Sequence, residues 1–133
     1  MLFRSARNHV AVDRPDFAGQ CARDGVVEHA GPATRPSTLP LGAIEAALRD
    51  AQLNVVHSDD AGDYLCNLLF YRLLHTAADT GVARAGFIHV PYLGSQIARL
   101  AAAGKDIAHG GTLEEDQLLR GVKAVIDACA VVT

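Results

Sequence analysis

The stretch that decides the fold is DAGDYLCNLLFYRLL, residues 60–74, followed by GFIHVP at residues 86–91. The first passes from a turn-forming segment rich in Asp and Gly into a run with apolar residues at helical spacing. The second is a short apolar run closed by a proline, which is typical of a strand that ends there. The two stretches raise the question whether Cys66 and His89 are core residues or a nucleophile and its base.

Helical and strand patterns alternate on both sides of these stretches. LGAIEAALRDAQ, residues 41–52, predicts a helix, and NVVHS, residues 54–58, predicts a strand. We expect the helix with Cys66 to run from about residue 62 to residue 79, a strand at residues 86–90, and a helix at residues 95–102. This order of helix, strand, helix, strand and helix predicts an α/β layered fold.

The last helix has its own start signal. Glu115 lies three residues after Thr112 and completes a capping box, so we expect the helix to open at Thr112. Its apolar face contains Leu118, Leu119, Val122 and Val125.

The first forty residues are rich in proline and glycine, which indicates connecting segments with at most short strands, such as HVAV at residues 9–12. We therefore expect a single domain over residues 1–133, irregular over residues 1–40 and regular over residues 41–133. The length of 133 residues, with 50% hydrophobic and 20% charged residues, fits one packed domain.

Charge and hydropathy exclude several classes of partner. The net charge of -3 leaves no basic stripe for a phosphate backbone, which disfavours nucleic acid. No apolar run reaches the roughly 18–20 residues of a membrane helix, and MLFRSARNHV at the start lacks the apolar centre of a secretory signal. These features predict a cytoplasmic protein that binds neither membrane nor nucleic acid.

The three cysteines, Cys21, Cys66 and Cys129, are widely spaced and form no CxxC pair. This disfavours a disulfide framework and a zinc site, so we expect no metal and no cofactor. Cys21 lies in the irregular part and Cys129 in the last helix, and both are expected to be chemically idle. The other histidines show no ligand-like spacing, and we expect surface or loop positions for His9, His29, His57, His75 and His109.

Two readings of Cys66 and His89 stay open on spacing alone. Cys66 shares a helix face with Leu69 and Phe70, which favours a buried structural cysteine, and a histidine within a strand is equally unremarkable. On the other side, a cysteine in the first turn of a helix is favoured as a thiolate by the helix dipole and the unpaired amide groups. If residues 54–58 and 86–90 form neighbouring strands, both side chains reach the same sheet edge.

The motifs go further than the spacing. DAGDYLCNLLFYRLL and GFIHVPYLGSQ, with GPATRPSTLP upstream at residues 31–40, resemble the pyrrolidone-carboxylate peptidases, or pyroglutamyl peptidase I, a family of cytoplasmic cysteine exopeptidases. The resemblance implies a three-layer α/β/α sandwich of the phosphorylase/hydrolase-like type. It also implies removal of N-terminal pyroglutamate from peptides, no cofactor, and a homo-oligomer, because family members often form tetramers.

The resemblance assigns roles to four residues. Cys66 matches the nucleophile of the family, and His89 matches its base. Tyr64 and Leu65 match residues that face the pyroglutamyl ring. The backbone amide of Cys66 is then a candidate oxyanion donor.

The chain also departs from the family pattern. FRSARN, residues 3–8, matches the family segment ERxAxN with Phe3 in place of the glutamate that is the third catalytic residue. The arginine that usually precedes xPD falls on Asp13, with Arg14 beside it. The family is longer at its N-terminus, where a GFxPF-like loop supplies aromatic walls for the lactam ring. These departures lead us to expect an N-terminally truncated peptidase domain with impaired activity.

Three functions remain for comparison. The first is a pyroglutamyl peptidase with a Cys66–His89 thiolate mechanism and reduced activity. The second is a non-catalytic family remnant that binds a peptide or a partner subunit. The third, a redox protein using Cys66 alone, is disfavoured because no resolving cysteine lies nearby in the sequence.

Overall fold

The computed structural model describes residues 1–106 and 111–130. Contacts between residues divide the chain into two compact units. The first unit comprises Met1–Leu39 and Val56–Ile88, and the second comprises Pro40–Val55 and His89–Thr133. Within the described ranges, no helix has the length and apolar character needed to cross a membrane.

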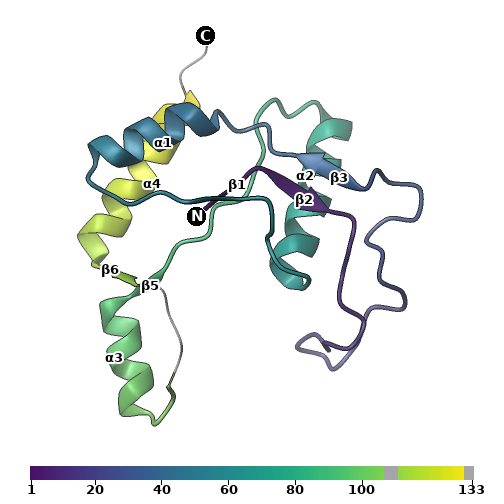
Figure 1. Ribbon diagram of the computed structural model, residues 1–133, viewed down its shortest axis with the longest axis horizontal. Helices are drawn as coiled ribbons and strands as arrows, with labels where there is room; N and C mark the ends of the chain where they lie inside the picture. The colour runs from purple at the N-terminus through teal and green to yellow at the C-terminus, as the bar shows by residue number, and fades with distance from the viewer. Residues whose placement is uncertain (107–110, 131–133) are drawn as a thin grey trace. The chain divides into compact units, whose positions relative to one another are not determined.

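The first unit combines short strands with one long helix (Figure 1). Strand β1 (Leu2–Phe3) pairs in parallel with β4 (His57–Ser58), and β2 (Ser5–Arg7) pairs antiparallel with β3 (Thr34–Pro36). Helix α2 (Leu65–Thr80) packs against β2 and β3. The N-terminal residues therefore lie beside the helix that contains Cys66.

Helix α2 has clear signals at both ends. It begins three residues later than predicted, after a turn in which Gly62 has φ of 84°, a left-handed value that favours glycine. It ends at Gly81, which has φ of 72°. This is the left-handed glycine that commonly terminates a helix.

The core of the first unit is built around three phenylalanine rings. The centroids of Phe3 and Phe87, and those of Phe70 and Phe87, are 5.8 Å apart, and those of Phe3 and Phe70 are 6.4 Å apart. Tilted rings at these separations are a favourable aromatic arrangement. The same cluster includes buried Ala6, Val10, Val27, Tyr71, Leu74, Ala77 and Ala85.

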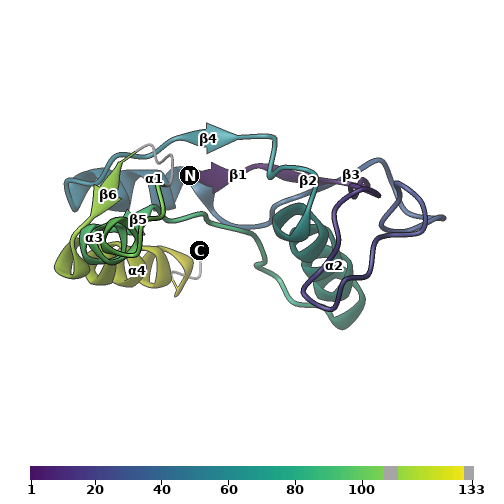
Figure 2. The same ribbon diagram turned by 90° about the horizontal axis from the view of Figure 1, so that it is seen from below.

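The second unit contains three helices and one pair of short strands. Helix α1 (Leu41–Asp50) packs along α4 (Glu115–Ala130), as Figure 2 shows from below. Strands β5 (Tyr92–Leu93) and β6 (Thr112–Leu113) pair in parallel, and α3 (Gly94–Ala102) follows β5 directly.

Gly121 of α4 explains how closely residues 48–53 approach that helix. It is buried, and a Cβ atom at this position would lie 2.9 Å from Leu53 Cδ1 and 3.7 Å from Leu48 Cδ2. Any larger residue would force the Leu53 side chain to move, whereas the distance to Leu48 is an ordinary contact. The absence of a side chain at Gly121 therefore permits the close packing.

The α/β class and all four predicted helices are confirmed, but the strands differ from prediction. NVVHS forms a strand only at His57–Ser58, and GFIHV forms one isolated antiparallel bridge, between Ile88 and Leu2. Leu2 N–H also donates to the Val56 carbonyl, at 2.8 Å, and Phe3 N–H to the Phe87 carbonyl, at 3.3 Å. Strand β1 thus lies between the two segments, so they are not the direct neighbours that the sequence suggested.

Two local predictions were wrong. The last helix begins at Glu115 and not at Thr112, because Thr112–Leu113 pairs with Tyr92–Leu93 as β6. Its start is capped two residues later than predicted, where Glu114 N–H donates to Gln117 Oε1 at 2.8 Å. The segment HVAV at residues 9–12 forms no strand.

Candidate active site

Cys66 is the second residue of α2 and so lies in the first helical turn, as predicted, and its thiol is free and partly buried. The N–H groups of the first helical turn have no acceptor within the helix. They concentrate partial positive charge where the thiol is located. The position suits a nucleophile at a helix start.

Asn67 fixes this helix start to the rest of the first unit. Its side chain is fully buried, and its Oδ1 accepts a hydrogen bond from Arg7 N–H at 2.9 Å. Its Nδ2 donates to the carbonyls of Arg7 and His9, both at 2.8 Å. Sequence reasoning did not identify this role, although Asn67 directly follows Cys66 in the quoted motif.

Asn8 holds the loop that precedes β3 through a similar set of hydrogen bonds. Its Nδ2 donates to the carbonyls of Glu28 and Gly31, and its Oδ1 accepts from the N–H groups of Val27 and Glu28. The residue is the asparagine of the FRSARN segment, which was the only signal available in the sequence.

Tyr64 and Leu65 border Cys66 on its N-terminal side. The Tyr64 hydroxyl donates to the Pro15 carbonyl, which ties the segment around Pro15 to the start of α2. Leu65 is 49% exposed and offers an apolar surface next to the thiol. Their contact with a substrate ring remains a prediction.

His89 follows the bridge at Ile88, and it is exposed. It begins the second stretch of the second unit, whereas Cys66 belongs to the first unit. The pairing of the two side chains therefore rests on the sequence motifs and remains a prediction.

Phe3 occupies the position at which the resemblance places a glutamate. Only 3% of Phe3 is exposed, because its ring packs against Phe70 and Phe87. Arg14, beside the other departure from the family pattern, forms an ion pair with Asp63 at 3.2 Å. Phe3 and Arg14 thus both make contacts within the first unit.

A second polar cluster lies on the side of α2 that faces β3. Arg35 donates to Glu28 Oε2 at 2.9 Å, lies 2.9 Å from His75 Nδ1, and covers the ring of Tyr71 at 5.0 Å. The hydrogen bond from Arg35 is the main reason that the pKa of Glu28 lies below its usual value. His75 also pairs with Asp79, at 3.2 Å. It is thus a half-buried network member and not a plain surface residue.

One predicted histidine and one hollow in the second unit remain to be described. His109 lies outside the described residues. In the second unit, a hollow where α3 and α4 begin is lined by Ser95 and by Glu114, Glu115 and Asp116, and it includes none of the predicted site residues. Among the described residues, no three His, Cys, Asp or Glu side chains are arranged to hold a metal ion.

Comparisons with known proteins agree with the motifs. The family model described as pyroglutamyl peptidase matches residues 2–131. Pyrrolidone-carboxylate peptidase 1 of Ralstonia nicotianae is 39% identical over 115 residues, which cover 84% of this chain and 49% of that protein. Pyrrolidone-carboxylate peptidase of Pseudomonas fluorescens is 44% identical over 84 residues, or 63% of this chain and 39% of that protein. The chain therefore spans between two fifths and one half of these curated relatives.

Solved structures give the same result for the fold. A mutant pyrrolidone carboxyl peptidase from the hyperthermophile Pyrococcus furiosus has a TM-score of 0.83 and 30% identity, covering 96% of this chain and 61% of that one. Structures reported for the same enzyme and its Cys-free mutant give a TM-score of 0.82 and 31% identity.

Proposed function

The chain belongs to the pyroglutamyl peptidase family, and from this premise we propose that it is a cysteine exopeptidase that removes N-terminal pyroglutamate from peptides. The observation that carries the proposal is Cys66 in the first turn of α2, on a helix start that buried Asn67 fixes in place. The proposal includes the cytoplasmic location and homo-oligomeric state implied by the resemblance, and no nucleic-acid or membrane partner.

In the proposed reaction the Cys66 thiolate attacks the carbonyl carbon that joins pyroglutamate to the next residue. The Cys66 N–H donates to the oxyanion that forms on the carbonyl oxygen. His89, carrying the thiol proton, gives it to the leaving amine as the C–N bond breaks. Water, deprotonated by His89, then cleaves the thioester, releases pyroglutamate and restores the thiol.

Substrate recognition is assigned to the residues just before Cys66. A pyroglutamyl ring has an apolar face together with one N–H and one carbonyl, so its site must combine an apolar wall with polar backbone groups. Exposed Leu65 supplies apolar surface, and the ring of Tyr64 adds to it while its hydroxyl binds Pro15.

We further propose that turnover is slow. Phe3 supplies no carboxylate to hold His89 in one tautomer, and loss of the acid from a serine triad reduces turnover by about 10⁴-fold. The same observation favours the second candidate, a chain that binds peptides through this surface without cleaving them.

Hydrolysis of a pyroglutamyl fluorogenic amide by the purified chain separates the two candidates. The peptidase proposal expects turnover that disappears in Cys66→Ala and survives in the Cys21→Ser/Cys129→Ser double variant. Mass spectrometry after treatment with pyroglutamyl chloromethyl ketone should show the label on Cys66. No labelling of Cys66 and no turnover above the Cys66→Ala background would reject the peptidase, and saturable binding of the peptide would then support the second candidate.

A further inference from the structure

An acidic turn precedes Cys66, and each of its aspartates is paired with an arginine from the N-terminal segment. Arg4 forms two hydrogen bonds with the carboxylate of Asp59, Arg7 lies 2.7 Å from Asp60, and Arg14 lies 3.2 Å from Asp63. We call this group the arginine clamp: Arg4, Arg7 and Arg14 with Asp59, Asp60 and Asp63.

Arg7 differs from the other two arginines because it contacts both sides of Cys66. Its guanidinium donates to Asp60 Oδ1 and, at 3.2 Å, to the Gly62 carbonyl, before the helix begins. Its backbone N–H and carbonyl both bind the side chain of Asn67, the residue after Cys66. One residue thus connects the two ends of the segment that carries the thiol.

The turn itself depends on the carboxylate that Arg7 binds. Asp60 Oδ1 accepts from Gly62 N–H at 2.9 Å, at the point where Gly62 adopts its left-handed conformation. Asp60 N–H donates to Ser58 Oγ at 3.1 Å. The guanidinium therefore binds the oxygen that shapes the turn, as well as the carbonyl of the left-handed Gly62.

These ion pairs are too exposed to act mainly through global stability. The side chains of Arg7 and Asp60 are 41% and 65% exposed, and exposed pairs typically contribute little to the free energy of unfolding. We therefore expect these ion pairs to act locally, on the geometry of the Gly62 turn and of the first helical turn of α2.

We propose that Arg7 is a positioning residue for Cys66. It holds the Gly62 turn and Asn67 at fixed places, and so aligns the first N–H groups of α2 with the thiol. The inference rests on the proposed function, because it treats Cys66 as the nucleophile. It goes beyond that function by assigning a role to an arginine that falls on an unspecified position, x, of the ERxAxN pattern.

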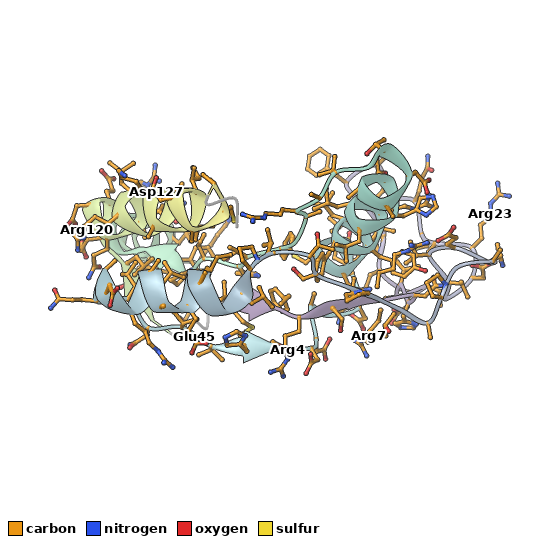
Figure 3. All side chains as sticks on the ribbon, turned by 90° about the horizontal axis from the view of Figure 1, so that it is seen from above. Arg4, Arg7, Arg23, Glu45, Arg120 and Asp127 are labelled. Carbon is orange, nitrogen blue, oxygen red and sulfur yellow. The ribbon has the colours of Figure 1, made fainter. Side chains whose placement is uncertain are left out.

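Figure 3 shows Arg4 and Arg7 on the side of β1 and β2 away from α2, and Arg23 projecting from the far end of the first unit. Arg23→Leu is accordingly a matched control for Arg7→Leu. Asp60→Asn is a milder test, because an asparagine side chain keeps an acceptor for Gly62 N–H and removes only the charge.

The test measures the rate at which iodoacetamide alkylates Cys66 at pH 7, followed by peptide mass spectrometry so that Cys21 and Cys129 do not interfere. Misalignment of the first turn should weaken the electrostatic contribution of the helix N-terminus to the reactivity of Cys66. A contribution of this kind corresponds to about a two- to fivefold change in the alkylation rate. We expect Arg7→Leu to slow alkylation by that factor and Asp60→Asn to slow it less. Arg7→Lys should recover part of the loss, and Arg23→Leu should match the parent chain.

Hydrolysis provides the second readout: kcat should fall in Arg7→Leu and Asp60→Asn while KM changes little. If Arg7→Leu fails to fold by circular dichroism, Asp60→Asn decides the question. Unchanged or faster alkylation in folded Asp60→Asn overturns the positioning role. Alkylation is measured without substrate, so clamp-dependent alkylation in a chain that never hydrolyses the amide would reject the peptidase and retain the role of Arg7.

Discussion

Asn67 binds both backbone polar groups of Arg7, accepting from its N–H at 2.9 Å and donating to its carbonyl at 2.8 Å. The buried side-chain amide thus binds the N–H and the carbonyl of Arg7, as the backbone of a neighbouring strand would. It joins the start of α2 to the end of β2. Because Asn67 directly follows Cys66, this contact also positions Cys66.

Replacing Asn67 should therefore destabilise the first unit. Asn67→Ala removes three hydrogen bonds, each worth about 0.5–1.5 kcal/mol, so we expect the free energy of unfolding to fall by about 2–4 kcal/mol. Urea denaturation followed by circular dichroism measures the change. Asn54→Ala, at an exposed position, is the matched control. Equal stability of the two variants would show that Asn67 has no such role.

Leu65 allows a test of substrate contact that does not involve the nucleophile. Leu65→Ala should raise KM for a pyroglutamyl amide with little change in kcat, because it removes apolar surface from the proposed ring site. Leu69→Ala, on another exposed leucine one turn further along α2, should leave both constants unchanged. The parent chain should also prefer pyroglutamyl over prolyl amides. Equal rates on both amides would instead indicate an unspecific thiol.

The aromatic cluster makes a definite prediction for the position of the family glutamate. Phe3→Glu places a carboxyl group against Phe70 and Phe87, and we expect the unfolding free energy to fall by about 3–5 kcal/mol without a gain in hydrolysis. Phe3→Leu keeps the site apolar and should cost less. Thermal melts and the fluorogenic assay check both variants. A stable Phe3→Glu protein with faster turnover would contradict this account.

The sequence predicted the parts of the fold that depend on local pattern. Helix α1 and helix α2 follow from apolar spacing. The failures arose from contacts distant in sequence. Nothing in GFIHV shows that Leu2 and Phe3 lie between it and residues 56–58, and nothing in TL at residues 112–113 shows its pairing with Tyr92–Leu93.

The candidate site was predictable to the same degree. The position of Cys66 at a helix start followed from the turn before it and the apolar run after it. The contacts that hold it did not, because Asn67 and Arg7 meet across sixty residues of sequence. A polar residue that is buried by a distant backbone partner has no local pattern of its own.

The network of Glu28 predicts how stability depends on pH. The Arg35 hydrogen bond holds the pKa of Glu28 below its unfolded value, so the folded protein binds fewer protons than the unfolded chain in this range. The stabilisation is therefore complete above the unfolded pKa, near 4.3, and is lost as pH falls through the lower folded value. We expect the free energy of unfolding of the parent chain to decrease as pH falls below about 5. Glu28→Gln should flatten this decrease, and Glu115→Gln, at the exposed start of α4, should change it less. Urea titrations at a series of pH values measure the slope, and an identical slope in Glu28→Gln would show that the pair with Arg35 does not contribute to acid sensitivity.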